Sequence, residues 1–542
     1  MRSTGFEYDV VVAGAGPVGT VLACELRRAG VSVLMLERRA GPDATSRGWA
    51  GSMGPLAFEV LDRLGLGEPV LAAEERTLAE YERMFAAWAR AAGQDGASPS
   101  EPKEHFGGLE RIDPARRTSP ERRRVRLEQP VLQDLLWRHA DELGVVLHRE
   151  HEVVGVEQDE ECVAVTVSTQ GRTYRLRTQY LVGCDGTTST VRGLAGFDFP
   201  GTDPSMTGRV AVVELAEDAR LTPGVHFTPE GAYVYGLGLN RLTTAEFGSG
   251  PPAEDRPLTR EEMQDSIRRV SGRPVTLANF TSGIRWTDPA RQASEYRRGR
   301  VLLCGDAAHM YAPVGGQGLN VGLTDAANLG WKLAAQVHRW APSGLLDSYR
   351  GERHPVAERL LQNTKAQIAL IRSDPQSSAL RELFDELFEL DDVHRLIADM
   401  LAGMDVRYPL GSAHPLVGTL IGDAELSVAT DDSGATGKTR LATLFDGRGV
   451  LVDLRAGSAV SAAAAPWAAR VRRTAATAIG PVARTDADAL LLRPDGCVAW
   501  ALPPDAPFHA AQLRTALASW FGEPGTTEEA RSADRQGVIH TS

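Results

Sequence analysis

The sequence contains few cysteines, and none of them is spaced for a metal site or a redox motif. The five cysteines lie far apart, without a CxxC or zinc-binding pattern: Cys24, Cys162, Cys184, Cys304 and Cys497. Three of them lie in apolar or glycine-rich runs, so we expect mostly buried thiols, which suits a reducing compartment. The cysteines therefore predict no metal site.

The sequence also lacks a long apolar run and an excess of basic residues. No uninterrupted apolar stretch reaches the roughly 18 residues that a membrane helix needs. The N-terminal residues lead into a strand without the apolar segment of a signal peptide. The 59 Lys and Arg residues against 71 Asp and Glu residues give a net charge of −12, which is not the basic footprint of a nucleic-acid binder. We predict a cytoplasmic enzyme without a membrane or nucleic-acid partner.

The remaining composition is that of an ordinary globular protein. Apolar residues make up 42% and charged residues 24% of the chain, which argues against extensive disorder. At about 150 residues per unit, 542 residues correspond to three or four structural units. The chain is long enough to bury a sizeable core.

The N-terminal segment has the pattern of a dinucleotide-binding unit. Tyr8 to Ala13 is a short apolar run typical of a strand buried on both faces. The glycine motif G-x-G-x-x-G follows at residues 14–19, and residues 20–29 have helical character. A second apolar strand is expected over residues 31–36 and ends at Glu37.

Each glycine of this motif has a physical role. Gly14 permits a tight turn, Gly16 lets the backbone approach a pyrophosphate, and Gly19 lets the helix pack close to the strand. The phosphates would lie at the helix N-terminus, where free N–H groups and the helix dipole favour an anion. Glu37 can accept hydrogen bonds from a ribose, which indicates FAD or NAD without deciding between them.

Two later segments end buried strands with a carboxylate. Residues 180–186 read YLVGCDG, and residues 301–306 read VLLCGD. A carboxylate such as Asp306 at a strand end can bind a hydroxylated chain such as ribityl. A helix is expected over about residues 320–337. The N–H groups of Leu319 and Asn320 at its start would direct a positive dipole end at negative charge in a ring system.

Together these motifs resemble the single-component FAD-dependent aromatic hydroxylases, the group A flavoprotein monooxygenases. The resemblance covers about residues 8–540. It is strongest to the branch that acts on aromatic polyketides and related antibiotics, including rifamycin-type monooxygenases. The segments 291–300 and 346–355 look like that branch in particular.

The resemblance implies a set of FAD-binding residues. Glu37 would hold the adenosine ribose, Asp185 would serve both FAD and the nicotinamide cofactor, Asp306 would hold ribityl, and the carbonyl of Pro313 would lie near the flavin C4a atom. The complete set is Gly14, Gly16, Pro17, Gly19, Glu37, Arg38, Arg47, Gln129, Asp185, Asp306, Pro313, Gly318, Leu319 and Asn320. The chain departs from the family at residues 52–56, which lack a second arginine, and at Tyr311, where relatives often have a histidine.

The implied fold is α/β, with a Rossmann-like FAD-binding domain of the GR2 type, an inserted β-sheet substrate domain and a C-terminal thioredoxin-like domain. The FAD-binding domain would comprise residues 1–75, 105–200 and 290–400. The substrate domain would comprise 76–104 and 201–289, and the C-terminal domain 405–542. Because that last domain lacks CxxC and Cys497 is alone, we infer no thiol-redox role for it.

Aromatic residues of the second insert are candidates for substrate contacts. Phe227, Tyr233 and Tyr235 are predicted to bind the substrate, since Tyr233 and Tyr235 alternate onto one face of an expected strand. The alternative is that the tyrosines fill the core of that domain.

The implied reaction inserts one oxygen atom into an aromatic polyketide, or a related polycyclic phenol or quinone, in antibiotic biosynthesis. NADPH, with NADH also possible, would reduce FAD, and O₂ would then give a C4a-hydroperoxyflavin. Baeyer–Villiger or ring-opening oxygenation, antibiotic inactivation of the rifamycin type, and a flavin-fold binding protein without turnover are the alternatives.

The cofactor carries the chemistry. We therefore assign no catalytic side chain, and we expect His309 to be packed or capping. The protein is expected to be a monomer or homodimer.

Overall fold

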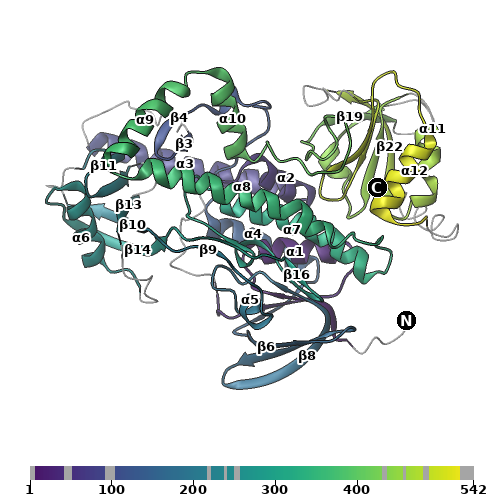
Figure 1. Ribbon diagram of the computed structural model, residues 1–542, viewed down its shortest axis with the longest axis horizontal. Coiled ribbons are helices and arrows are strands. Elements are labelled where there is room, and N and C mark those ends of the chain that lie inside the picture. The colour runs from purple at the N-terminus through teal and green to yellow at the C-terminus, as the bar shows by residue number, and fades with distance from the viewer. Residues whose placement is uncertain are drawn as a thin grey trace.

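Figure 1 presents the computed structural model of the chain. It describes residues 6–41, 52–91, 104–216, 221–236, 241–248, 257–429, 436–455, 459–479 and 487–524. Helices α7 (Gly318–Val337) and α8 (Ser348–Ile371) run through the middle of the molecule. A five-stranded sheet lies on the left of Figure 1, and the C-terminal domain lies at the upper right. The fold is mixed α/β.

A sheet of eight strands forms the centre of the described N-terminal and middle parts of the chain. β1 (Tyr8–Ala13) pairs in parallel with β2 and β8, and Val10 to Val12 are completely buried. A strand covered on both faces needs a continuous apolar run, so the sequence predicts this strand with its observed bounds. The other strands are β2 (Val33–Glu37), β5 (Val146–Arg149), β6 (Glu152–Gln158), β7 (Val163–Thr169), β8 (Arg172–Gly183), β16 (Arg297–Arg298) and β17 (Val301–Leu303).

Two helices begin earlier than the sequence predicts. α1 (Pro17–Arg28) starts three residues before Thr20, and α7 starts at Gly318 rather than at Asn320. The first N–H groups of a helix have no partner within it, so proline and glycine are tolerated in the first turn. β2 starts at Val33 rather than at Val31.

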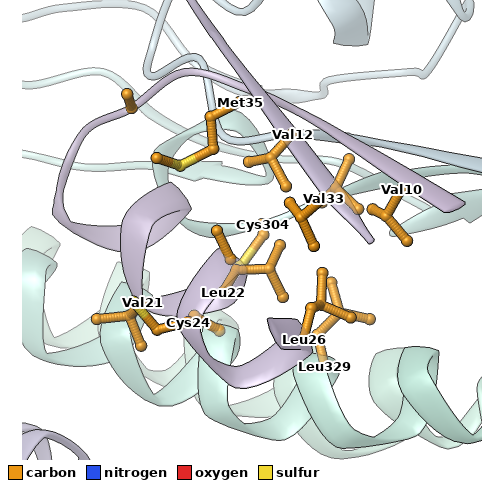
Figure 2. Packing of buried hydrophobic residues seen from close by; sticks show 14 of the residues in the cluster. Val10, Val12, Val21, Leu22, Cys24, Leu26, Val33, Met35, Cys304 and Leu329 are labelled. Atoms are coloured by element: carbon orange, nitrogen blue, oxygen red, sulfur yellow. The ribbon is translucent and has the colours of Figure 1, made fainter. Parts of the chain in front are cut away.

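α1 is packed between the central sheet and α7. Figure 2 shows Leu22 and Leu26 of α1 between the valines of the strands and Leu329 of α7. All three leucines are fully buried. A Cβ at Gly322 of α7 would lie 2.6 Å from Val18 of α1, so the two helices approach closely at their first turns. This packing fixes the start of α7 relative to the glycine loop that precedes α1.

The five-stranded sheet has two distinct faces. Its order is β11 (Gly224–Thr228), β12 (Gly231–Tyr235), β13 (Arg241–Phe247), β10 (Met206–Leu215) and β14 (Leu277–Thr287). The outer face packs on α6 (Arg260–Ser271) through a cluster that includes Ala211, Val213, Tyr233, Leu242, Met263 and Ile267. The inner face packs on the loop before α7 and on α8 through Met206, Phe227, Ala232, Ala245, Trp286, Ala312, Val314 and Ile368.

Further elements surround this frame. A three-stranded sheet consists of β9 (Gly201–Thr202), β15 (Ala290–Gln292) and β18 (His309–Met310), and a hairpin consists of β3 (Glu104–Phe106) and β4 (Leu109–Ile112). The remaining helices before residue 403 are α2 (Pro55–Arg63), α3 (Gly67–Ala91), α4 (Gln129–Glu142), α5 (Thr190–Leu194), α9 (Pro375–Leu387) and α10 (Asp391–Ala402). α3 runs across the expected boundary between residues 75 and 76, and the domain limits stay a prediction.

The C-terminal domain contains a six-stranded sheet. Its order is β20 (Thr436–Arg440), β19 (Glu425–Ala429), β22 (Val471–Ile479), β21 (Gly449–Asp453), β23 (Ala489–Leu492) and β24 (Val498–Leu502), accompanied by α11 (Ala459–Ala464) and α12 (Ala510–Phe521). Its likeness to thioredoxin stays a prediction. Cys497 is buried and burial raises the pKa of its thiol, so the thiolate is strongly disfavoured.

A buried ionic cluster joins this domain to α7 and α8. Arg493 donates to both carboxylate oxygens of Glu352, at 2.7 and 2.8 Å, and Lys332 donates to the same carboxylate at 2.8 Å. Burial raises the pKa of Glu352, but the two cations outweigh it and hold the pKa well below its usual range. A buried charge of this kind is tolerated because it is paired.

None of the described helices is long and apolar enough to cross a membrane.

Candidate active site

The glycine loop makes the tight turn that its sequence predicts. Gly14 has a φ of +99°, and a Cβ there would lie 2.4 Å from the carbonyl oxygen of Cys184. A Cβ at Gly19 would lie 2.1 Å from the carbonyl oxygen of Gly14. Both positions exclude any side chain because backbone atoms occupy the space. The loop is therefore held close to β8 on one side and to its own helix on the other.

Gly16, the middle glycine of the motif, faces open space. Gly16 caps the N-terminus of α1, and a Cβ built on it meets nothing within 4 Å. Pro17 is the first residue of the helix, where its missing N–H costs nothing. The helix N-terminus thus presents free N–H groups and the positive end of its dipole to an unobstructed region, which is the arrangement that binds an anion.

Glu37 reaches from the end of β2 to the glycine loop. Its carboxylate accepts hydrogen bonds from the N–H of Ala15 at 3.0 Å and from the N–H of Arg39 at 2.9 Å. The carboxylate oxygens have further lone pairs that can accept from ribose hydroxyls. Arg38 lies beside it with an exposed side chain. Arg47 lies outside the described residues.

Asp185 is engaged with its own loop. Its carboxylate accepts from the hydroxyl of Ser189 at 2.5 Å and from the N–H of Val191 at 3.0 Å. The side chain is half-buried, so part of the carboxylate remains accessible. Arg192 on the following helix donates to the carbonyl of Ala307 at 2.9 Å. This bond joins the motif at residues 184–186 to the motif at residues 305–306, and Arg192 is not among the cofactor residues predicted from sequence.

The carboxylate of Asp306 is reached by solvent, although protein atoms surround it closely. Its side chain is exposed, and no described residue donates a hydrogen bond to its carboxylate. Nevertheless, burial raises its pKa, while nearby His309 acts in the opposite direction. Solvent reaches this carboxylate within dense protein surroundings. An unpartnered acceptor of this kind fits a polyol chain, whose hydroxyls would donate to it.

The start of α7 also offers free donors. Val321 is the first residue whose N–H bonds back to Gln317, so the N–H groups of Gly318, Leu319 and Asn320 have no acceptor among the described residues. The side chain of Asn320 is used internally. It accepts from the N–H of Gly54 at 2.6 Å and donates to the carbonyl of Gly316 at 2.9 Å. Asn320 therefore fixes the loop, and its backbone is the part left for a ligand.

A buried polar chain lies behind this loop. His309 contacts Asp325 through Nε2 at 2.7 Å, and Arg353 donates to the same carboxylate at 2.6 Å. All three side chains are buried, so His309 is packed as expected. Tyr311 stacks on His309, with ring centroids 5.7 Å apart and planes at 13°. The hydroxyl of Tyr311 is buried and has no partner in the described chain.

These features fit the binding of FAD. The elements that pack on one another contribute an anion-binding helix start, an accepting carboxylate at the end of β2, an unpartnered Asp306 and a second free helix start. The buried hydroxyl of Tyr311 lies within 3.2 Å of the position of a Cβ on Gly318, beside that second helix start. Burial raises the pKa of Tyr311, so the hydroxyl stays a donor that a bound group could satisfy. Gln129 is the first residue of α4, and Pro313 is exposed between Ala312 and Val314.

The three aromatic candidates for substrate contacts lie on different faces of the five-stranded sheet. Phe227 is on the inner face, opposite Ala232 and under the guanidinium of Arg381, which lies 4.3 Å from the ring centroid. Tyr233 is 5% exposed and belongs to the outer core with α6, and Tyr235 packs against the same core. The structure therefore separates the tyrosines from Phe227. For Tyr233 it matches the alternative that the residue fills the domain core.

Several named proteins are similar to this chain over nearly its whole length. A 12-dehydrotetracycline 5-monooxygenase/anhydrotetracycline 6-monooxygenase from Streptomyces rimosus is 39% identical, over 95% of this chain and 99% of that protein. A rifampicin monooxygenase from Streptomyces venezuelae is 36% identical, with the same shares covered. A dialkyldecalin synthase from Streptomyces rugosporus is 37% identical, over 95% of this chain and 98% of that protein.

A solved structure and two family models agree with these relatives. The structure of an anhydrotetracycline hydroxylase from Streptomyces rimosus superposes with a TM-score of 0.83 at 37% identity, covering 96% of this chain and all of the other. Residues 7–364 match the model of an FAD binding domain, and residues 414–524 match the model of the aromatic-ring hydroxylase C-terminal region. The chain belongs to the FAD-binding aromatic-ring hydroxylase family of flavoprotein monooxygenases, as its motifs indicated.

Proposed function

We propose that this protein inserts one oxygen atom from O₂ into an aromatic polyketide, with FAD as bound cofactor and NADPH as electron donor. The observation that carries the proposal is the set of cofactor features at the glycine loop, Glu37, Asp306 and the start of α7. The relatives that act on anhydrotetracycline and rifampicin, by their names, support a polycyclic antibiotic-type substrate. When bound, FAD supplies the redox chemistry and the activation of oxygen.

The chain's own residues would hold the cofactor at both ends. The N-terminus of α1, at Gly16, would bind the pyrophosphate, and Glu37 would accept from the adenosine ribose. Asp306 would accept from ribityl hydroxyls. The free N–H groups of Gly318 and Leu319 would stabilise negative charge at the pyrimidine edge of the ring, where the dipole of α7 would add to them.

The inner face of the five-stranded sheet would hold the substrate. It packs against Ala312 and Val314, the two neighbours of Pro313, so an aromatic ring on this face lies next to the flavin loop. Trp286 and Phe227 give this face flat apolar surface, and Trp286 covers Gly208, where a Cβ would lie 2.0 Å from its indole ring. Such a face positions the reacting ring and excludes water, which is the protein's share of the catalysis.

A second candidate function is ring formation without net oxidation. It is favoured by one observation, the 37% identity to a protein named dialkyldecalin synthase. In that case a polyene would fold against the same apolar face, and NADPH would not be consumed. Baeyer–Villiger and ring-opening oxygenation share the cofactor requirements of hydroxylation and differ only in the product.

The test supplies the FAD-loaded protein with NADPH, air and a panel of polycyclic phenols and quinones that includes anhydrotetracycline and rifampicin. We expect at least one compound to stimulate NADPH oxidation and to return with one added oxygen atom in the mass spectrum. Fragmentation then distinguishes a ring hydroxyl from a lactone. Conversion of a polyene to an isomer of unchanged mass, without NADPH, would instead establish the ring-forming function.

A further inference from the structure

The inner face carries one arginine whose position follows from the strand register. Arg241 opens β13 and pairs directly with Val212 of β10. Its neighbour Leu242 is fully buried in the outer core with α6. Because successive residues of a strand point to opposite faces, Arg241 and Thr243 belong to the inner face. Val212 and Val234, also on that face, are only half-buried.

Arg241 has no hydrogen-bond acceptor within the described chain. The neighbouring arginines of this sheet behave differently. Arg209 of β10 donates to Glu262 at 2.9 Å and to Glu246 at 2.8 Å, and Arg285 of β14 donates to Glu262 at 2.7 Å. All of those contacts lie on the outer side with α6. The inner face therefore presents its one unpaired guanidinium, among the residues that the structure describes, to a largely apolar surface.

The partly buried surroundings of Arg241 disfavour a guanidinium that has no partner. Burial lowers its pKa, and the negative charge of Glu128 acts in the opposite direction. The two side chains nevertheless form no ion pair within 4 Å. Glu128 caps the start of α4, directly before Gln129, a residue predicted to contact FAD. Arg241 and Glu128 thus face the same region, the side of the sheet on which the flavin loop lies.

We propose that Arg241 binds an ionised oxygen of the substrate, so that the aromatic polycycles this protein accepts are those with an acidic phenol or enol. This inference rests on the proposed function and narrows its substrate class. A guanidinium is the side chain best suited to a fixed oxyanion because its planar donors stay charged and are directional. Among half-buried valines, such a bond would be stronger than in water. The same anion would be the electron-rich form of the ring that oxygen transfer requires.

The test uses a matched pair of ligands, 2-hydroxy-1,4-naphthoquinone, whose enol is acidic, and its 2-methoxy ether, which cannot ionise. Each is titrated into the FAD-loaded protein without NADPH, and binding is read from the change in flavin absorbance. We expect the wild-type protein to bind the acid at least tenfold more tightly than the ether. Arg241→Gln should lose about tenfold in affinity for the acid and keep its affinity for the ether, and Arg241→Lys should fall between.

Two control variants separate recognition from folding. Arg175→Gln removes an exposed arginine of β8 that pairs with Glu157 and should bind both ligands as the wild type does. Glu128→Gln removes the competing negative charge and should tighten binding of the acid. If Glu128 and Arg241 instead form a merely structural pair, Glu128→Gln would weaken both ligands, and the inference would be wrong.

Other results of these titrations would overturn the inference. Equal loss of both ligands in Arg241→Gln, or loss of flavin from that variant, would assign the arginine to packing or to the cofactor and overturn the inference. If the wild-type protein binds neither acid nor ether, or both equally, acidic substrates are not its class. The proposed function would still stand if a neutral aromatic compound stimulated NADPH oxidation.

Discussion

The expected nucleotide end of the FAD-binding domain, which comprises residues 14–19 and Glu37, and the five-stranded sheet present their surfaces by different means. At the nucleotide end, backbone N–H groups and glycines form the surface, and a side chain at Gly14 or Gly19 would collide with backbone atoms. On the sheet, the inner surface consists of side chains such as Phe227 and Trp286, placed by strand register. Backbone recognition constrains sequence tightly, whereas a side-chain surface can be built from many residue types.

This difference explains what each region tolerates. The pyrophosphate and the ribityl chain of FAD do not change with the substrate, so a backbone surface that binds them can stay fixed while the substrate changes. Substrates differ, and a sheet face can change its shape one side chain at a time without altering its fold. We therefore expect substitutions at the nucleotide end to affect folding or cofactor retention, and substitutions on the inner face to affect substrate affinity.

The largest effect is expected from a pair of glycine substitutions in the same loop. Gly14→Ala places a Cβ 2.4 Å from the oxygen of Cys184 at a φ of +99°, which should destabilise the fold by more than about 4 kcal/mol. Gly16→Ala meets nothing within 4 Å, so it should leave the stability of the apoprotein unchanged. It should nevertheless lose FAD, because its methyl group occupies the space of the pyrophosphate. Thermal unfolding and flavin content distinguish the two variants.

A stable Gly14→Ala variant, or a Gly16→Ala variant with full flavin content, would contradict the assignment of the glycine loop. Gly41 serves as the matched control. A Cβ there also meets nothing within 4 Å, and the residue lies outside the loop. Gly41→Ala should therefore affect neither stability nor flavin content.

The next effect concerns the outer face of the sheet. Hydrogen bonding from Arg285 and Arg209 lowers the pKa of Glu262 to about 2, against the opposing effect of burial. Because the pKa is depressed in the folded protein, the stabilisation is complete above pH 4.5, the ordinary value, and is lost as the pH falls toward 2. Glu262→Gln should cost about 1–2 kcal/mol at neutral pH and flatten this acid dependence. Unfolding measured from pH 6 to about pH 3 tests both statements, and an unchanged acid profile would refute them.

Asp306 should show opposite effects on stability and on cofactor binding. Burial raises its pKa, so the ionised carboxylate costs free energy in the apoprotein at neutral pH. Asp306→Asn should therefore slightly stabilise the apoprotein and weaken FAD binding about tenfold, which corresponds to about 1.4 kcal/mol. Equilibrium dialysis of flavin and thermal unfolding of the apoprotein measure the two effects. Unchanged flavin affinity would count against the ribityl assignment.

The smallest effect is a contrast between the two faces of the sheet. Phe227→Leu should raise the KM for an aromatic substrate about threefold, since a flat contact worth about 0.5–1.5 kcal/mol is lost, and should change the melting temperature little. Tyr233→Leu should lower the melting temperature and leave KM unchanged. The reverse result would place the substrate on the outer face.

The strands and the glycine turn at the expected nucleotide end could be predicted from sequence. The runs at Tyr8–Ala13 and Val301–Leu303 have the composition of buried parallel strands, and the glycine spacing follows from backbone geometry. The faces of the five-stranded sheet could not be assigned from alternation. Alternation groups Tyr233 with Tyr235, but only the pairing partners show that this face meets α6. The hydrogen bonds from Arg192 to Ala307 and from the N–H of Gly54 to Asn320 join residues far apart in sequence, and they leave no local pattern.

The central claim is that oxygen from O₂ is transferred to an aromatic substrate held beside FAD. The most direct measurement supplies the FAD-loaded protein with NADPH, ¹⁸O₂ and whichever compound of the panel stimulates NADPH oxidation, and determines the isotope content of the product. We predict one ¹⁸O atom per product molecule when the label is supplied as ¹⁸O₂, and no label when it is supplied as water. An unlabelled product, or an isomer of unchanged mass formed without NADPH, would contradict it.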